Sequence, residues 1–424
     1  MDKTRLLEKL RRTGFFHIFG VNVINKILGF GNTIILVRIL TRQEYGLFAY
    51  AMNIYGWVLL FQGLRMDSAA LQLLSEKRQD KDFCQRVMRQ STIWGGTVSL
   101  ALGVILLGIG LWMPLTFPET SDLFYLLCLL PLCQFIYNLM CTYLRTELRN
   151  QDFSQMSLLY TLVSVVVGIG GAYLFRVKGL ILGLYLAAVA AVLWGYFRLK
   201  LRIDFGAKPL PATDKRSLWY IGLISVFNDG VSAMLYMLDI FVLGIYFANE
   251  QILAGYKTAT LIPFGLLFIP SALVTYIYPY FANHNRDGHW CLDNYRRLLK
   301  WFGSFNLGLA TVMCFFAPQI VSLVFGTRYL DVVPIFQILA ANYFFSATFR
   351  NVAGNLLVTQ RKLKFNFYVA LLCGLVNIPA DILFIKWWGG EGAALATLLV
   401  TIISGILCTG YLVRVFKKQV TIRK

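Results

Sequence analysis

The stretch STIWGGTVSLALGVILLGIGLWM, residues Ser91–Met113, decides the class of this protein, because it contains no charged side chain. An α-helix rises about 1.5 Å per residue, so this stretch is long enough to cross a hydrocarbon core of about 30 Å. It is one of twelve such apolar blocks, which cover residues 14–37, 47–73, 91–113, 122–144, 154–176, 179–198, 218–246, 253–281, 299–325, 331–358, 364–386 and 390–415. The sequence therefore predicts an all-α polytopic membrane protein with 12 transmembrane helices.

The distribution of basic residues predicts which side of the membrane each connection faces. The chain has 40 Lys and Arg residues. Thirty of them lie at the two ends of the chain or in or beside every second gap between the blocks, and seven lie in or beside the other gaps. Basic residues concentrate on the cytoplasmic side of membrane proteins. Both termini are therefore predicted to be cytoplasmic.

Composition and loop length exclude several other classes. Hydrophobic residues make up 58% of the chain, and its net charge of +19 lies in short segments beside helix ends. Topology and anionic lipid headgroups explain that charge, so no nucleic-acid partner is expected. The eight cysteines form no CxxC motif or Cys/His cluster, so no metal site is predicted. The gaps are too short for a catalytic domain, and the three histidines form no acid–base pair, so an enzyme is not expected.

The apolar blocks form two sets of six, separated by a basic stretch with two prolines. The predicted organisation is an N-terminal lobe 1–199, a cytoplasmic linker 200–217 and a C-terminal lobe 218–424. Three junctions of the first set resemble their counterparts in the second set, in the same order. Because six is even, both lobes would enter the membrane from the same side, as parallel repeats about an axis along the membrane normal. Such folds bind substrate between the lobes near the midplane.

Three basic residues lie inside the apolar blocks and away from the block edges: Lys26, Arg65 and Arg350. A charge at the centre of a membrane helix costs about 3 kcal/mol on insertion scales, so a retained charge is a candidate for function. Asn22 and Asn25 share a helical stripe with Lys26. The alternatives are a buried structural ion pair for Lys26 and snorkelling to the interface for Arg65.

Helix 218–246 has the most regular polar stripe. It comprises Asn228, Asp229, Ser232, Tyr236 and Asp239. An intramembrane carboxylate can pair with a base, bind a cation or carry a proton, so Asp229 and Asp239 are candidates for ion coupling through H⁺ or Na⁺. The alternative is a static ion pair with Lys26 or Arg350.

A second polar stripe lies on helix 331–358. Asn342, Ser346 and Arg350 recur there at four-residue spacing, which places them on one helix face and predicts that they line the cavity. Asp381 lies close to the outer end of its block and is expected to be solvated.

The junction ILVRILTRQEYGLFAYA (35–51) resembles the first helix connection of bacterial polysaccharide repeat-unit flippases of the Wzx type. The segments FQGLRMDSAALQLLSE (61–76) and VFGTRYLDVVPIFQILA (324–340) resemble two further junctions of that family. These flippases belong to an exporter superfamily that also contains MATE multidrug antiporters and lipid II flippases. The resemblance covers essentially the whole chain and implies a V-shaped, MATE-like bundle in the bacterial inner membrane.

The resemblance also implies a cargo. It is an undecaprenyl-pyrophosphate-linked oligosaccharide, moved from the inner to the outer leaflet by alternating access for O-antigen or exopolysaccharide synthesis. Lys26, Arg65 and Arg350 would bind the pyrophosphate, because cationic donors bind phosphate oxygens strongly away from water. Membrane lipids and a polysaccharide polymerase with its chain-length machinery are the other expected partners. The competing functions are an ion-coupled multidrug antiporter and, more distantly, a membrane-embedded polymerase.

Overall fold

The computed structural model describes residues 15–422, and these residues form helices with no strand among them. Within this range the described side chains exclude those of 15–19, 227–236, Thr275, Pro279, Ala282, Leu363 and Ile422. The chain divides into two compact units, Met1–Met234 and Leu235–Lys424. The predicted all-α class is confirmed. The predicted boundaries 1–199, 200–217 and 218–424 stay predictions.

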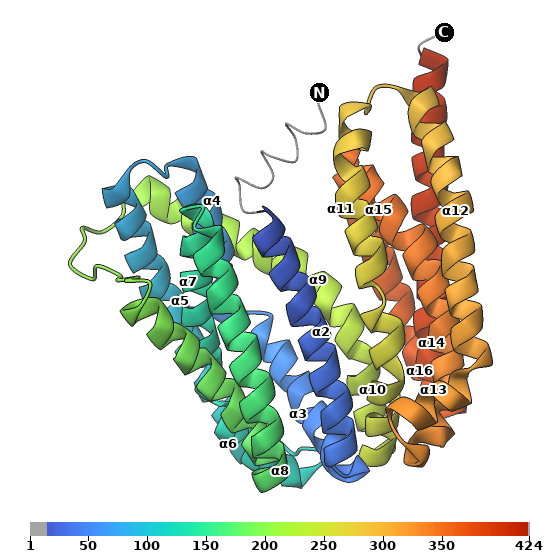
Figure 1. Ribbon diagram of the computed structural model, residues 1–424, viewed down its shortest axis with the longest axis horizontal. Coiled ribbons are helices and arrows are strands. Elements are labelled where there is room, and N and C mark those ends of the chain that lie inside the picture. Colours follow the sequence, from blue (N-terminus) through green and yellow to red (C-terminus); the bar gives the residue numbers. More distant parts are fainter. Residues whose placement is uncertain (1–14, 423–424) are drawn as a thin grey trace. The chain divides into compact units, whose positions relative to one another are not determined.

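Unit 1 is a bundle of mostly long helices (Figure 1). Its helices are α2 (Phe15–Ile39), α3 (Arg42–Leu59), α4 (Met66–Glu76), α5 (Lys81–Trp112), α6 (Ser121–Leu127), α7 (Leu130–Thr146), α8 (Asn150–Phe197) and the first part of α9 (Ala212–Phe247). α8 packs along both α2 and α7, and α7 also packs against α4 and α5. In the core, Met66 of α4 and Phe135 of α7 are buried together with Leu218 of α9.

The long helix α8 reverses direction near its middle. Its backbone leaves the helical region at Phe175 and Arg176, and the φ of Arg176 is +56°. A Cβ atom on Gly171 would lie 2.4 Å from the carbonyl oxygen of Gly179, so the two arms approach as closely as they do because both positions are glycine. The reversal falls at the junction that the sequence predicts between blocks 154–176 and 179–198.

Unit 2 contains the end of α9 and the remaining helices (Figure 1). These helices are α10 (Glu250–Gly265), α11 (Phe268–Asn283), α12 (Gly288–Phe315), α13 (Ala317–Val324), α14 (Val333–Phe345), α15 (Asn351–Thr359) and α16 (Leu363–Ile422). A π-helical turn, Ser346–Arg350, joins α14 to α15. α16 reverses at Gly389, whose φ is +57°. A Cβ atom on Gly392 would lie 2.0 Å from the carbonyl oxygen of Phe384, so this hairpin also requires glycine.

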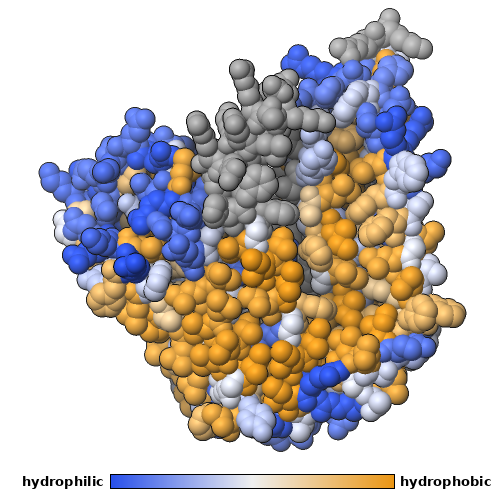
Figure 2. Space-filling view, in the orientation of Figure 1, coloured by the Kyte–Doolittle hydropathy of each residue, from blue (hydrophilic) through white to orange (hydrophobic). Residues whose placement is uncertain are grey.

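Large apolar side chains cover much of the surface of both units, as a lipid environment requires (Figure 2). Among the described residues, eight helical stretches are long and apolar enough to cross a membrane, or up to nine if the bent pair Pro118–Leu127 and Leu130–Thr146 forms one span. α8 falls in one of these stretches and most of α16 in another, although each of these two helices reverses at its break. The protein is therefore a multi-pass membrane protein, while the number twelve and the cytoplasmic termini stay predictions.

Candidate functional site: charges and polar groups within the helices

Lys26 is an exposed charge in the middle of α2. The side chain forms no ion pair or hydrogen bond with any residue that the structure describes. Asn22, one turn earlier, is also exposed, whereas Asn25 is half-buried and its Nδ2 donates a hydrogen bond to Ser157 Oγ at 2.8 Å. The residues of the predicted stripe therefore have different surroundings. Asn25 joins α2 to α8 through its hydrogen bond, whereas Lys26 is free to contact a ligand.

Arg65 lies at a break in the second apolar block. Gly63, Leu64 and Arg65 all have positive φ, between 46° and 53°, so the block is not one helix but α3 and α4 joined through a 3₁₀ turn. A Cβ atom on Gly63 would lie 2.3 Å from the ring of Phe135, so any other residue there would have to displace that ring and adopt a strained positive φ. The half-buried Arg65 therefore precedes the N-terminus of α4, where unpaired backbone N–H groups favour anions.

Unit 2 contains a buried acidic pair. Asp239 of α9 is 4% exposed and Asp381 of α16 is 0% exposed, and the two carboxyl groups lie side by side. Tyr256 Oη and Thr397 Oγ1 both donate hydrogen bonds to Asp239 Oδ2, the second at 2.7 Å. Apart from the neighbouring carboxyl group of Asp239, the oxygens of Asp381 have no hydrogen-bond partner among the described residues. Two adjacent carboxylates shielded from water repel each other, so either one of them takes up a proton or a cation neutralises their charge.

The expectation that Asp381 is solvated is wrong. Its position near the end of an apolar block suggested contact with water, but α16 turns it into the interior of unit 2 against α9. The sequence analysis also did not identify Tyr256, Thr397 and Asn377 as site residues. Asn377 and Asp381 are four residues apart, which places these two on one helix face, and this spacing could have indicated both of them.

A cavity of about 30 Å³ adjoins Asp239 of the acidic pair, which is room for one water molecule or one small cation. Arg350 lines this cavity from the end of the π-helical turn. Its other lining residues are Asp239, Phe264, Asn377, Thr397, Val400 and Thr401. Arg350 thus shares a cavity with a carboxylate, and its predicted role as a pyrophosphate ligand stays a prediction.

The other predicted cavity residues are placed as follows. Asn342 and Ser346 are 3% and 4% exposed, so they lie in the interior of unit 2 and do not face an open cavity. The side chains of Asn228, Asp229, Ser232 and Tyr236 lie outside the described residues.

Lys257 is a basic residue near the start of block 253–281, where the sequence counted it with the adjoining gap. The structure places it two turns inside α10, directly after Tyr256, where it is half-buried. It forms no ion pair with any described residue, so it adds a fourth intramembrane cation. Lys257 lies only four residues after the start of block 253–281, so the sequence did not distinguish it from the basic residues of the connections.

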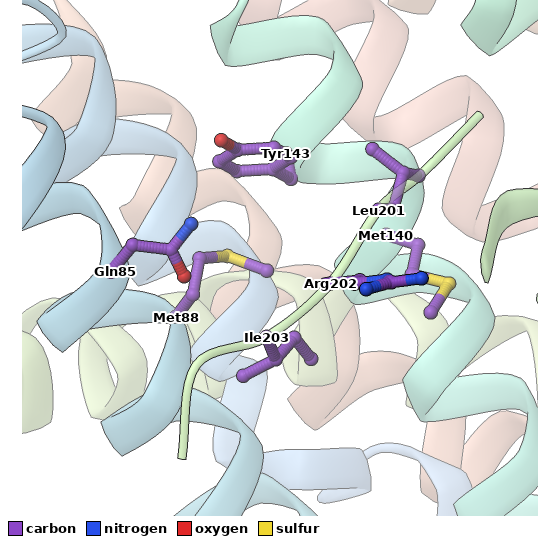
Figure 3. Close-up of a pocket in the computed structure, with 7 residues that line it drawn as sticks. All are labelled: Gln85, Met88, Met140, Tyr143, Leu201, Arg202 and Ile203. Carbon is purple, nitrogen blue, oxygen red and sulfur yellow. The ribbon is translucent and has the colours of Figure 1, made fainter. Parts of the chain in front are cut away.

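A narrow gap between α5, α7 and the stretch after α8 is excluded as a site (Figure 3). Arg202 and Ile203 pack there against Met88 and Met140. The gap holds only about 10 Å³, less than a water molecule needs, so it is a packing contact that fixes the start of the linker.

Solved structures define the class of protein that has this fold. A lipid II flippase, MurJ, in an inward closed conformation matches with a TM-score of 0.76 at 16% identity, over 95% of this chain and 89% of that chain. An inward-facing multidrug resistance MATE family transporter of the MOP superfamily matches with a TM-score of 0.74 at 14% identity, over 94% of this chain and 96% of that chain. The chain therefore has the fold of the MOP transporter superfamily.

Sequence comparison identifies the family. A family model described as polysaccharide biosynthesis protein matches residues 35–334, and the chain belongs to that family. The lipopolysaccharide biosynthesis protein WzxC of Escherichia coli K12 is 27% identical over 230 residues, which are 52% of this chain and 44% of WzxC. The match thus spans less than half the length of this curated relative. The resemblance to Wzx-type proteins is confirmed, and the protein is a multi-pass protein of the inner membrane.

Proposed function

We propose that this protein is a flippase that moves undecaprenyl-pyrophosphate-linked oligosaccharide units from the inner to the outer leaflet. The observation that carries the proposal is Lys26, an exposed charge about 18 Å along its helix with no partner among the described residues. A lone charge at that depth costs about 3 kcal/mol against hydrocarbon, and a hydrophilic cavity with an anionic ligand removes that cost. Membership of a polysaccharide biosynthesis family supports a glycan cargo.

The pyrophosphate is assigned to the cations of unit 1. Lys26 supplies a flexible ammonium group, and Arg65 supplies a planar guanidinium group beside the N-terminus of α4. Charge-assisted bonds of this kind are about twice as strong as neutral hydrogen bonds. Neither cation would attract a positively charged drug, so the pattern favours an anionic cargo.

Coupling is assigned to unit 2. The cavity beside Asp239 has carboxylate, hydroxyl and amide oxygens in its wall, which are the ligands that a hard cation prefers, and the guanidinium group of Arg350 lines it as well. A proton shared by the pair would neutralise it as well. We propose that binding of Na⁺ or H⁺ here drives the conformational change of alternating access.

The proposed function is tested in a host whose own gene is deleted and which has no redundant flippase. The mutant is complemented with the wild type or with Lys26→Ala/Arg65→Ala, and lipid-linked oligosaccharide is measured on each leaflet. We expect accumulation on the cytoplasmic leaflet and loss of surface polysaccharide, both restored by the wild type alone. Restoration by the double variant at equal protein level would contradict the pyrophosphate assignment.

A second candidate function is an ion-coupled multidrug or small-molecule antiporter. The observation in its favour is the acidic pair in a fold shared with a MATE transporter. Normal surface polysaccharide in the deletion strain, together with a new sensitivity to toxic cations that the gene relieves, would establish it and exclude the flippase.

A further inference from the structure

A groove runs between α11 and α12 in unit 2, apart from the acidic pair and its cavity. It encloses about 400 Å³, within the range of small-ligand sites. Its walls are mainly aromatic, and one cation and one amide lie among them. The residues that matter are Tyr276, Tyr280, Trp290, Asn294, Arg297 and Trp301.

The aromatic walls of the groove are open to the surroundings. Tyr276 is 68% exposed, Tyr280 46% and Trp301 73%, and the two tyrosine rings lie with centroids 5.5 Å apart. Tyrosine and tryptophan side chains collect at the level of lipid headgroups, where one end of the ring is apolar and the other is wet. The groove therefore lies at a membrane–water boundary, on the side that the basic residues predict to be cytoplasmic.

The polar groups of the groove select for a single anion. Arg297 is exposed and forms no ion pair or hydrogen bond with any described residue. Asp293, one turn earlier and also exposed, forms no ion pair with it. Asn294 Nδ2 donates a hydrogen bond to the carbonyl oxygen of Trp290 at 2.8 Å. Among the residues that line the groove, Arg297 is the one that carries a charge.

We propose that this groove binds an anionic glycerophospholipid of the cytoplasmic leaflet, with its phosphate on Arg297 and its glycerol region between the aromatic walls. Basic pockets between membrane helices bind such headgroups, and the leaflet supplies them at high concentration. Phe305, 54% exposed and one turn beyond Trp301, extends the apolar wall along α12 for the acyl chains.

The test is native mass spectrometry of the full chain in detergent, titrated with phosphatidylglycerol and, separately, with phosphatidylethanolamine. Arg297→Gln should weaken phosphatidylglycerol binding about fivefold, because one basic group near the surface contributes about that factor. Trp301→Ala should weaken it as well. Arg296→Gln is the matched control, since Arg296 is equally exposed on the same helix but does not line the groove. Equal thermal midpoints would show that all variants are folded.

Three results would overturn the assignment. The first is equal retention of phosphatidylglycerol by wild type and Arg297→Gln. The second is equal retention of phosphatidylethanolamine and phosphatidylglycerol by the wild type. The third is that lipid-linked oligosaccharide displaces phosphatidylglycerol from the wild type but not from Arg297→Gln. This result would show that the groove binds the transported lipid. None of these outcomes depends on transport, so the test is independent of the proposed flippase activity.

Discussion

Lys26 in unit 1 and the Asp239–Asp381 pair in unit 2 are both charged groups in apolar helices, yet they have opposite surroundings. Lys26 is exposed and has no partner among the described residues, whereas the two carboxyl groups are buried together and Asp239 accepts hydrogen bonds from two hydroxyl groups. An exposed cation can contact a large ligand that enters from outside. A buried acidic pair beside a cavity of about 30 Å³ can accept only a proton or a small ion. In the proposed function, this difference assigns cargo binding to unit 1 and ion coupling to unit 2.

The largest effect is expected from Lys26→Ala. Flipping of lipid-linked oligosaccharide in proteoliposomes should fall about 10- to 100-fold, because a charge-assisted contact contributes about 1.5–3 kcal/mol. The thermal midpoint should stay unchanged, since the side chain packs against nothing that the variant would lose. Lys26→Arg should retain most of the flux, and Lys81→Ala, an exposed cation at the start of α5, is the control. Wild-type flux in Lys26→Ala would contradict the assignment of cargo binding to Lys26.

Asp381→Asn should uncouple transport from its driving ion. The cation concentration for half-maximal flux should rise about tenfold or more, and the variant should be more stable than wild type, because the like-charge conflict with Asp239 disappears. Flux is measured after a Na⁺ jump and, separately, after a pH jump, which identifies the ion. Asp293→Asn, an exposed carboxylate of α12, is the control. An unchanged response to both jumps would leave the pair as a structural feature.

Tyr256→Phe sharpens the assignment of the ion site, because it removes one hydrogen bond to Asp239 while keeping the ring. A hydrogen bond to a charged group contributes about 1.5–3 kcal/mol, and part of that is recovered by rearrangement, so a threefold to tenfold rise in the half-maximal cation concentration is expected. Tyr246→Phe, at the exposed end of α9, should behave as wild type. If Tyr256→Phe altered cargo affinity and left the cation response intact, the two sites would not be separate.

The smallest effect is expected from Asn25→Ala. The hydrogen bond from Asn25 to Ser157 joins α2 to α8, so its loss should lower the free energy of unfolding by about 1 kcal/mol and change flux less than twofold. Asn22→Ala, one turn away and exposed, should leave stability unchanged. A loss of flux from Asn25→Ala as large as that from Lys26→Ala would show that Asn25 belongs to the cargo site, as the sequence predicted.

The breaks inside the apolar blocks could be predicted only in part. Gly63 and Gly389 are glycines at the positions where the backbone requires positive φ, but many other glycines in the chain lie in regular helix. Packing does not distinguish them either, because the ring of Phe135 occupies the space that a Cβ atom would need both at Gly63 and at Gly95, which lies in regular helix, whereas at Gly389 this space is not crowded. The left-handed conformation of Arg65, directly before α4, was likewise not predicted.

The sequence by itself determined the membrane class, the apolar blocks and the intramembrane charges, since hydrophobic length and unsolvated charge are properties of short segments. It also indicated the family. The tertiary structure alone decided which polar groups meet. Asp239 and Thr397, for example, are 158 positions apart and become hydrogen-bonded because α16 folds back against α9. Such a meeting depends on how helices pack around small residues and kinks, and no local pattern in the chain encodes it.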